Sequence, residues 1–417
     1  MNASLRACCC IAGGGPAGMM LGLLLARAGL EVIVLEKHRD FLRDFRGDTI
    51  HPSTLEIMHE LGLLQRFLAL PHDEVREIEA NVGGVRVPVA DFTHLPTRCQ
   101  FLAFMPQWDF LDFLAAEARR YPGFSLHLQA EVIDLVVSSG AIDGVVAATP
   151  EGRLEVRADL VVGADGRHST VRERAGLAVD VFGAPIDVLW FRLPRRGDQL
   201  AATAGYVGGG HILVMLDRGT YWQCGFVIAK GSYDRIRAEG LPALRDEIAV
   251  LAPIAAGSVG ELKDWDVVKL LSVQVDRLRQ WYRPGLLCIG DAAHAMSPIG
   301  GVGINLAIQD AVAASNLLAA ALRAGRPALA LLRRLQRRRE LPTRVTQRFQ
   351  IEIQNRVIAP VLAGDRTRRQ TLPLPLRALQ RYPALRRIPA RLLGLGFRPE
   401  HLRAARVGSA AGLDPAP

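Results

Sequence analysis

Three glycines close to the start of the chain have the spacing of a phosphate-binding turn. They form the pattern Gly13-x-Gly15-x-x-Gly18 between two apolar runs. Gly13 permits the tight turn, Gly15 lets the backbone approach a pyrophosphate, and Gly18 lets a helix pack closely on a strand. The amide groups and the dipole at the start of that helix then favour the anion. The pattern therefore predicts dinucleotide binding.

An acidic residue supports this prediction. Glu36 ends the next apolar run, at the distance where a carboxylate accepts a hydrogen bond from an adenosine ribose. The order of elements also fits, with strands at Ala7–Ile11 and Glu31–Leu35 and a helix at Met19–Ala28 that stops at Gly29. Both strands are nearly continuous apolar runs, as in parallel strands covered on both faces. This unit by itself leaves FAD and NAD open.

Two later segments decide between these cofactors by resemblance to a known family. One is Val161-Val-Gly-Ala-Asp-Gly-Arg-His-Ser-Thr-Val-Arg172, and the other is Leu287-Cys-Ile-Gly-Asp-Ala-Ala-His-Ala-Met-Ser-Pro-Ile-Gly-Gly-Val-Gly-Ile-Asn-Leu306. They resemble the second and third fingerprints of the single-component flavoprotein aromatic hydroxylases, the group typified by p-hydroxybenzoate hydroxylase. The three patterns occur in the family's order, across most of residues 5 to 320. The resemblance implies that the dinucleotide is FAD.

The resemblance also implies roles for individual residues. Asp291 corresponds to a buried acid that binds a ribityl hydroxyl, and the helix start within 298–305 would stabilise negative charge on the reduced flavin. Asp165 and Gly166 correspond to a supporting motif, although a capping turn explains them equally well. The residues expected to bind the cofactor are Gly13, Gly15, Pro16, Ala17, Gly18, Glu36, Lys37, Arg46, Gln107, Val132, Asp165, Gly290, Asp291, Pro298, Gly301, Gly303, Ile304 and Asn305.

In this family the cofactor rather than a protein side chain carries the reaction. NADPH or NADH reduces the FAD, dioxygen adds to it as a C4a-hydroperoxide, and an electron-rich aromatic ring takes the distal oxygen. The sequence has no HExxH or GxSxG pattern and no Cys/His cluster, so we expect no metal. The expected function is hydroxylation of a phenolic or polyprenyl-aromatic small molecule, with the choice between NADH and NADPH open.

Three other functions on the same fold remain as alternatives. A reductase or dehydrogenase would use FAD without inserting oxygen. A non-catalytic flavoprotein scaffold would not need intact cofactor motifs. A flavin halogenase would carry the pattern Trp-x-Trp-x-Ile-Pro, which this sequence lacks.

The expected fold class is α/β, with a Rossmann-like FAD-binding domain, an inserted and mostly antiparallel β-sheet substrate domain, and a helical C-terminal tail. Strand-like runs lie at Val188–Leu193, His211–Leu216 and Tyr221–Ile228, and the FAD-binding signature resumes at Gly285–Gly290. The sheet domain therefore interrupts the first domain. The predicted divisions are 5–180 with 273–330 for FAD binding, 181–272 for the sheet, and 331–417 for the tail.

Smaller elements follow from local patterns. We expect helices at Ser53–Leu61 and Gln107–Arg120, and a helical tail that is broken first at Pro342. Alternating residues predict an antiparallel meander with strands at Ser125–Val137, Gly144–Ala148 and Leu154–Val156, followed by a return to the parallel sheet at Leu160–Val162.

The inserted sheet is expected to supply the residues that face the substrate. His211, Met215, Trp222 and Gln223 are candidates, but alternation alone does not say which face of a strand points inward. His51 and His294 lie beside cofactor-binding segments, where a packed histidine is more common than a reactive one.

Most of the net charge of +9 lies near the end of the chain. From Arg323 to Arg406 there are roughly twenty arginines against about four acidic residues. Such a basic surface fits a solvated helix face, an acidic substrate or peripheral contact with an anionic membrane. Nucleic acid is not an expected partner, because stacking aromatic residues are not interleaved with the arginines.

The cysteines and the N-terminus indicate the compartment. Cys8, Cys9 and Cys10 lie in an expected buried strand, where they serve as small apolar residues in a reducing environment. The first residues lack a secretory pattern, and no uninterrupted apolar stretch reaches the roughly 18 to 20 residues that cross a bilayer. We expect a cytoplasmic protein, and the sequence leaves its oligomeric state open.

Overall fold

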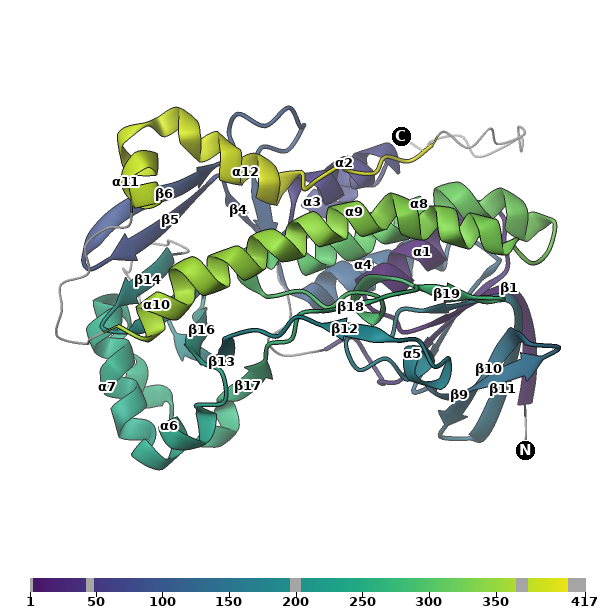
Figure 1. Ribbon diagram of the computed structural model, residues 1–417, viewed down its shortest axis with the longest axis horizontal. Helices are drawn as coiled ribbons and strands as arrows, with labels where there is room; N and C mark the ends of the chain where they lie inside the picture. The colour runs from purple at the N-terminus through teal and green to yellow at the C-terminus, as the bar shows by residue number, and fades with distance from the viewer. Residues whose placement is uncertain (1–2, 43–48, 196–203, 365–373, 404–417) are drawn as a thin grey trace.

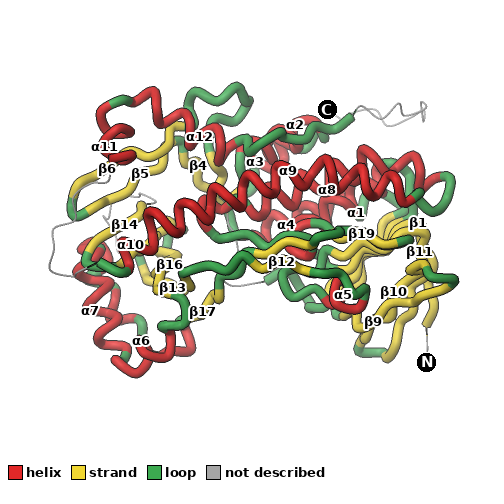
Figure 2. The backbone as a smooth tube through the Cα atoms, in the orientation of Figure 1, coloured by secondary structure: helices red, strands yellow, loops and turns green. Residues whose placement is uncertain are grey.

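The structure, a computed structural model, describes residues 3–42, 49–195, 204–364 and 374–403. The chain is a mixed α/β protein whose strands gather in two regions (Figure 2). A long helix, α9 (Leu329–Ile353), runs diagonally between these two regions (Figure 1).

The larger sheet has eight strands and carries the predicted glycine turn. Its strand order is β19–β20–β11–β1–β2–β8, with β10 paired to β11 and β9 paired to β10. The pairs β1–β11, β1–β2 and β2–β8 are parallel, as the apolar runs predict. The strands are β1 (Ala3–Ala12), β2 (Val32–Glu36), β8 (Phe124–Leu128), β9 (Glu131–Ser138), β10 (Ala141–Thr149), β11 (Gly152–Gly163), β19 (Tyr282–Arg283) and β20 (Leu286–Cys288).

Helices pack on this sheet and share one apolar core with it. Helices α1, α4 and α8 lie together above the sheet in Figure 1, and α1 packs against both of the others. The helices are α1 (Pro16–Arg27), α2 (Pro52–Glu60), α3 (Leu64–Leu68), α4 (Gln107–Ala118), α5 (Thr170–Arg174) and α8 (Gly303–Arg323). The predicted helices near Ser53 and Gln107 are confirmed. Pro16 and Pro52 each start a helix because their missing N–H needs no partner there.

The predicted meander is wrong in two places. The expected strand Ser125–Val137 is two strands, β8 in the parallel sheet and β9 in the meander, because Gln129 has a positive φ of 53° that turns the chain. The expected strands Leu154–Val156 and Leu160–Val162 are one strand, β11. This strand pairs with β10 antiparallel along its first part and with β1 in parallel from Leu154 to Gly163.

The second sheet has seven strands in the order β17–β13–β16–β15–β14–β5–β6. The three strands predicted in this region are confirmed. Strands β5 and β6 also join the sheet, although they lie far earlier in the chain than 181–272, because β5 pairs in parallel with β14. The elements are β5 (Glu77–Val82), β6 (Val85–Asp91), β13 (Ile186–Pro194), β14 (Ala204–Gly208), β15 (His211–Asp217), β16 (Tyr221–Ala229), β17 (Lys269–Ser272), α6 (Tyr233–Glu239) and α7 (Leu241–Leu251).

Two small sheets are formed by strands that are interleaved with those of the larger sheets along the chain. One has the order β3–β7–β4 and the other pairs β12 with β18. Their strands are β3 (Thr49–Ile50), β4 (Asp73–Val75), β7 (Leu102–Phe104), β12 (Val179–Val181) and β18 (Asp276–Leu278).

The C-terminal part is helical, as predicted, but Pro342 does not break it. Helix α9 continues through Pro342 because tertiary hydrogen bonds hold it on both sides, through Arg339 and Gln347. A π-helical turn, Gln354–Ile358, follows directly. The remaining helices are α10 (Ala359–Leu362), α11 (Leu374–Arg381) and α12 (Arg387–Gly394).

Two further sequence-based expectations concern burial. Cys9 and Cys10 are buried in β1 and, like Cys8, unpaired, which confirms their role as small apolar residues. Among the described residues, one helical stretch, Ile299–Arg323, has the length and composition to cross a membrane. The expectation that no uninterrupted apolar stretch is that long still holds, because Gln309 and Asp310 interrupt it. Of the most apolar part of this stretch, 67% is buried inside the protein, so the stretch resembles the core helix of a globular protein.

Candidate cofactor and active site

The glycine turn has the geometry that pyrophosphate binding requires. Gly13 has a φ of 105°, and a methyl group placed on it would lie 2.4 Å from the carbonyl oxygen of Ala164. A methyl group on Gly18 would lie 2.0 Å from the carbonyl oxygen of Gly13. A methyl group on Gly15, in contrast, would meet no atom within 4 Å. The first and third glycines are therefore fixed by packing, while the second faces a place where an anion fits at the start of α1.

Glu36 is tied to this turn. One of its carboxylate oxygens accepts a hydrogen bond from the N–H of Gly14 at 2.9 Å, and the other accepts one from the N–H of His38 at 3.1 Å. A carboxylate has about four acceptor positions. Glu36 therefore stabilises the turn, and its contact with a ribose hydroxyl stays a prediction.

The three sequence patterns meet in space. Gly13 lies against the backbone of Ala164 and Asp165. Gly290, which has a φ of 59°, lies against Ala17, since a methyl group there would be 3.1 Å from the Ala17 Cβ. The first turn is thus in contact with the second and the third pattern.

Asp165 makes the contacts of a capping residue. Its carboxylate accepts hydrogen bonds from Ser169 Oγ at 2.5 Å and from the N–H of Val171 at 3.0 Å, at the start of α5. Burial raises the pKa of Asp165, although these hydrogen bonds oppose the shift. These contacts favour the capping interpretation, and direct contact with the cofactor stays a prediction.

Asp291 is less buried than expected. Its side chain is 34% exposed, and one of its carboxylate oxygens lies 3.9 Å from the guanidinium group of Arg167. The preceding turn is fixed instead by Asp310, whose Oδ2 accepts a hydrogen bond from the N–H of Gly290 at 3.1 Å. An accessible carboxylate on a fixed turn fits an acceptor for a hydroxyl group.

Asn305 offers a donor for a cofactor. Its Oδ1 accepts hydrogen bonds from the N–H of His51 at 3.1 Å and from Thr54 Oγ1 at 2.6 Å, which fixes the orientation of the amide. Its Nδ2 is buried and has no hydrogen-bond partner among the described residues. A buried donor without a partner is costly. A carbonyl or anionic acceptor of a bound flavin fits this donor.

His51 links residues 300–305, which we call the cofactor loop, to the C-terminal helix α12. Its Nδ1 donates a hydrogen bond to the carbonyl oxygen of Leu393 at 2.6 Å. The Leu393 side chain also packs on Gly300, since a methyl group there would lie 2.5 Å from Leu393 Cδ2. Burial lowers the pKa of His51 to about 4, even though the carbonyl groups of Leu393 and Gly300 favour the charged form. The imidazole is therefore neutral at pH 7.

The remaining predicted cofactor residues lie in or beside these elements. Arg46 lies outside the described residues. The others are Pro16 and Ala17 at the start of α1, the exposed Lys37 after β2, the buried Gln107 at the start of α4, the buried Val132 in β9, and Pro298, Gly301, Gly303 and Ile304 around the start of α8.

The four candidates for substrate contact do not share one face. Met215 and Trp222 are 1% exposed and pack in the apolar cluster between the second sheet and helices α6 and α7. His211 lies beside them, stacked on Phe226 and 3.4 Å from Glu247 of α7. Gln223 points to the opposite face, where it accepts a hydrogen bond from Arg218. The helices cover the face that carries the first three.

Sequence reasoning missed a buried charge network beneath the third pattern. His294 Nε2 lies 2.6 Å from Asp310 Oδ2, and Arg339 Nε donates to Asp310 Oδ1 at 2.8 Å. Burial alone would raise the pKa of Asp310, but the charges and hydrogen bonds of His294 and Arg339 hold it below its ordinary value. No local pattern indicates this network, because Asp310 and Arg339 lie on different helices.

The chain is similar in sequence to a known protein family and to several known enzymes. The family described as "FAD binding domain" matches residues 6–349. The 6-methylpretetramide 4-monooxygenase of Streptomyces rimosus is 34% identical over 390 residues, which are 92% of this chain and 91% of the relative. The 12-dehydrotetracycline 5-monooxygenase/anhydrotetracycline 6-monooxygenase of Streptomyces rimosus subsp. rimosus is 30% identical over 321 residues, which are 72% of this chain but 60% of that longer relative.

A solved structure agrees in fold. The OxyS anhydrotetracycline hydroxylase from Streptomyces rimosus has a TM-score of 0.74 and 22% identity, covering 94% of this chain and 76% of its own. The family match spans most of the chain, and the first relative is similar over nearly all of it. The chain therefore belongs to the FAD-binding family of flavoprotein aromatic hydroxylases and is an FAD-dependent monooxygenase.

Proposed function

We propose that this monooxygenase hydroxylates a large, flat phenolic compound of fused rings, with NADPH or NADH as the electron donor and O2 as the oxidant. The observation that carries the proposal is an apolar face of the second sheet beside the cofactor loop. Val214 and Leu216 of β15 lie on this face and pack with Phe104 and Leu393. Because Leu393 also packs on Gly300, the apolar face and the loop adjoin. The names of the two relatives refer to pretetramide and tetracycline compounds, which supports a fused-ring substrate.

The cofactor residues divide into groups with different tasks. When bound, FAD supplies the electron transfer and the oxygen chemistry. The Gly13–Gly18 turn would hold the pyrophosphate and Glu36 the adenosine ribose. Asp291 would accept from a ribityl hydroxyl, and Asn305 Nδ2 with the start of α8 would favour negative charge beside the ring system.

The substrate would lie against the face of the second sheet that helices α6 and α7 leave uncovered. Side chains alternate between the two faces of a strand. Val214 and Leu216 therefore share a face with Gln223, opposite to Met215 and Trp222, through the pairing of β15 with β16. We assign Gln223 to the substrate side and the other three candidates to packing. A dry, apolar wall orients an aromatic ring and excludes water.

Our assignment of domains follows the predicted divisions with one addition. We assign residues 5–180 and 273–330 to the FAD-binding domain, 181–272 to the substrate sheet and 331–417 to the C-terminal region. The hairpin of β5 and β6 belongs with the substrate sheet, which supports an interface built from both parts of the chain.

The test combines spectra and turnover. Purified protein is loaded with FAD, reduced anaerobically with NADPH or NADH, and exposed to air with a panel of single-ring and fused-ring phenols. Faster flavin reduction and a hydroxylated product with a fused-ring phenol are expected. Turnover confined to single-ring phenols would contradict the proposed substrate class. Reduction of the flavin without oxygen transfer to any phenol would favour the reductase alternative.

We also propose that helices α11 and α12 contact an anionic membrane surface, where an apolar substrate partitions. Their outer side exposes apolar residues, with Leu374 79% exposed, Ile388 57% and Leu392 38%. The sequence from 374 to 399 contains arginines and no acidic residue. Exposed apolar residues beside arginines are typical of an interfacial helix.

Sedimentation with vesicles tests this contact. At low salt the protein should bind vesicles of anionic lipid and not vesicles of neutral lipid. The double variant Ile388→Asp/Leu392→Asp should lose binding, while Val250→Asp, at an 83% exposed site on α7, should retain it. Equal binding by both variants, or no binding by the wild type, would rule out this surface.

A further inference from the structure

One side of helix α9 and the π-helical turn that follows it is polar and buried. Its members are spaced three or four residues apart, so they lie on one face of the helix. We call them the polar stripe: Gln336, Arg339, Thr343, Gln347, Gln350 and Gln354, each between 0% and 8% exposed. Apolar residues are the rule at such positions. Burial of six polar side chains is costly unless each finds hydrogen-bond partners.

Gln350 binds the backbone of the segment that precedes the cofactor loop. Its Nε2 donates to the carbonyl oxygens of Ser297 and Ile299, both at 2.9 Å. Its Oε1 accepts from the N–H of Ser297 at 3.2 Å. Gln350 thus satisfies both backbone groups of Ser297, as a neighbouring strand would.

Its neighbours in the stripe bind the same segment. Gln347 Nε2 donates to the carbonyl oxygens of Asp276 at 2.7 Å and Ala295 at 3.0 Å, and so joins two stretches of the chain. Gln354 Nε2 donates to Ser297 Oγ at 2.8 Å. The last three glutamines of the stripe, Gln347, Gln350 and Gln354, therefore all bind residues 295–299.

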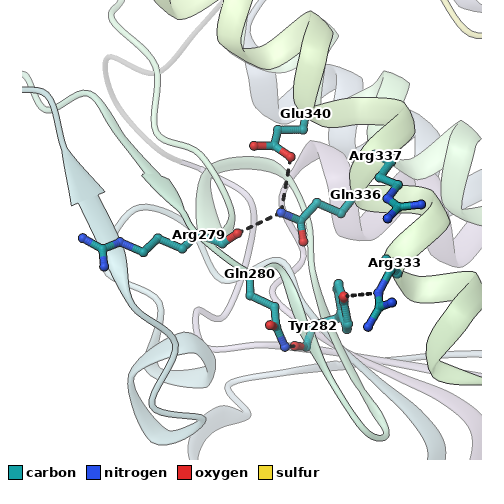
Figure 3. Close-up of a pocket in the computed structure, with 7 residues that line it drawn as sticks. All are labelled: Arg279, Gln280, Tyr282, Arg333, Gln336, Arg337 and Glu340. Atoms are coloured by element: carbon teal, nitrogen blue, oxygen red, sulfur yellow. Dashed lines mark hydrogen bonds between the residues drawn. The ribbon is translucent and has the colours of Figure 1, made fainter.

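The first part of the stripe binds the chain before and beneath the Gly290 turn. Gln336 accepts from the N–H of Trp281 at 3.1 Å and donates to the carbonyl oxygen of Arg279 at 2.9 Å, beside the polar surface pocket drawn in Figure 3. Arg339 binds Asp310, which in turn accepts from the N–H of Gly290.

We propose that the last three members of the polar stripe, Gln347, Gln350 and Gln354, position the third flavin pattern, and that Gln350 is the central positioning residue. The proposal rests on the assignment of residues 290–305 to FAD binding. A glutamine amide has both donors and an acceptor, so it can bind the N–H and C=O groups of Ser297, which lies outside the described strands. These three glutamines would keep the loop at Gly300 and Gly301 in one conformation before FAD arrives, which lowers the entropy lost on binding. The last members of the stripe lie beyond residue 349, where the family match ends.

The experiment compares two substitutions that each remove buried amide bonds from α9. Gln350→Met removes the bonds to Ser297 and Ile299, and Gln336→Met removes those to Trp281 and Arg279. Methionine keeps a similar shape without the hydrogen bonds. Both variants should be less stable than the wild type, but only Gln350→Met removes hydrogen bonds to the segment next to the cofactor loop.

Three measurements decide the outcome. In apo protein, amide hydrogen exchange of residues 295–301 should rise about tenfold in Gln350→Met and less than about twofold in Gln336→Met. FAD should bind about tenfold more weakly to Gln350→Met, as measured by quenching of flavin fluorescence, with little change in the control. The midpoint potential of the bound flavin should shift only in Gln350→Met.

Equal changes in the two variants would overturn the proposal, because they would reflect stability alone. Unchanged exchange in Gln350→Met would also overturn it. If Gln350→Met does not fold, Gln354→Met, which removes only the bond to Ser297 Oγ, replaces it with the same criteria. A wild-type protein that binds no FAD would refute the proposed function, while the exchange measurement on apo protein would still test the stripe.

Discussion

The Nδ1 atom of His51 lies 2.6 Å from the carbonyl oxygen of Leu393, which is 342 residues later in the chain. The same histidine donates its backbone N–H to Asn305, at the start of α8. His51 therefore joins the N-terminal part of the protein, the cofactor loop and the last described helix. The C-terminal region therefore contacts the candidate cofactor site, although the family match ends at residue 349.

Acid should destabilise the protein through His51. The pKa of the buried imidazole is about 4, against an ordinary 6.5, so the unfolded chain binds more protons between these values and stability falls as pH falls from about 6.5 to 4. Between pH 7.5 and pH 5 this group alone should cost roughly 2 kcal/mol. Urea unfolding of wild type and His51→Gln at both pH values measures the difference.

The control for that experiment is His168→Gln, at an exposed site. It should keep the full pH dependence of the wild type. A pH dependence that His51→Gln leaves unchanged would show that other groups cause the acid sensitivity.

Two glycines of the first turn should respond differently to alanine. Gly15 has a φ of −75° and open space at its Cβ position, so Gly15→Ala should fold with the apo stability of the wild type but bind FAD at least about tenfold more weakly. Gly18→Ala places a methyl group 2.0 Å from the carbonyl oxygen of Gly13 and should lower apo stability by roughly 1 to 3 kcal/mol. Thermal unfolding of the apo proteins and flavin titration separate the two effects. Normal FAD affinity in Gly15→Ala would place the pyrophosphate elsewhere.

Removal of the acid after β2 should weaken FAD binding without loss of the fold. Glu36→Ala eliminates the acceptor for Gly14 and the proposed acceptor for the ribose, so we expect about a tenfold to hundredfold higher FAD dissociation constant. Glu31→Ala, at an exposed position just before the same strand, is the matched control. Titration of the apo proteins with FAD measures both constants. An equal loss in both variants would contradict a specific role for Glu36.

Adjacent residues of β15 test which face of the second sheet meets the substrate. Met215 packs toward α6 and α7, so Met215→Ala should lower stability by roughly 2 to 5 kcal/mol and leave the KM for the phenol unchanged. Leu216 lies on the opposite face, so Leu216→Ala should raise this KM or uncouple NAD(P)H oxidation from hydroxylation. Steady-state kinetics with hydrogen peroxide detection provides the readout. A KM that changes only in Met215→Ala would reverse the assignment of the faces.

The resemblance of two later segments to a known family indicated FAD as the cofactor. Local sequence determined the glycine turn and the strands that flank it. These features follow from short-range requirements: a positive φ at Gly13, close packing at Gly18, and continuous apolar runs in strands covered on both faces. The strands of the second sheet were also predicted from local sequence, as strand-like runs separated by turns. The individual cofactor contacts, such as those of Asp291, remain predictions.

Tertiary structure alone decided which residues meet. Alternation has a period of two and is identical for both faces of β15, so only the packing of α6 and α7 placed Met215 away from the cofactor loop. The same holds for β5, which joins a sheet formed much later in the chain, and for Pro342, which tertiary bonds retain inside α9. The polar stripe is visible in the sequence as helical spacing, but its partners at residues 276–299 are not. Hydrogen bonds between distant segments depend on the folded arrangement, which no local pattern encodes.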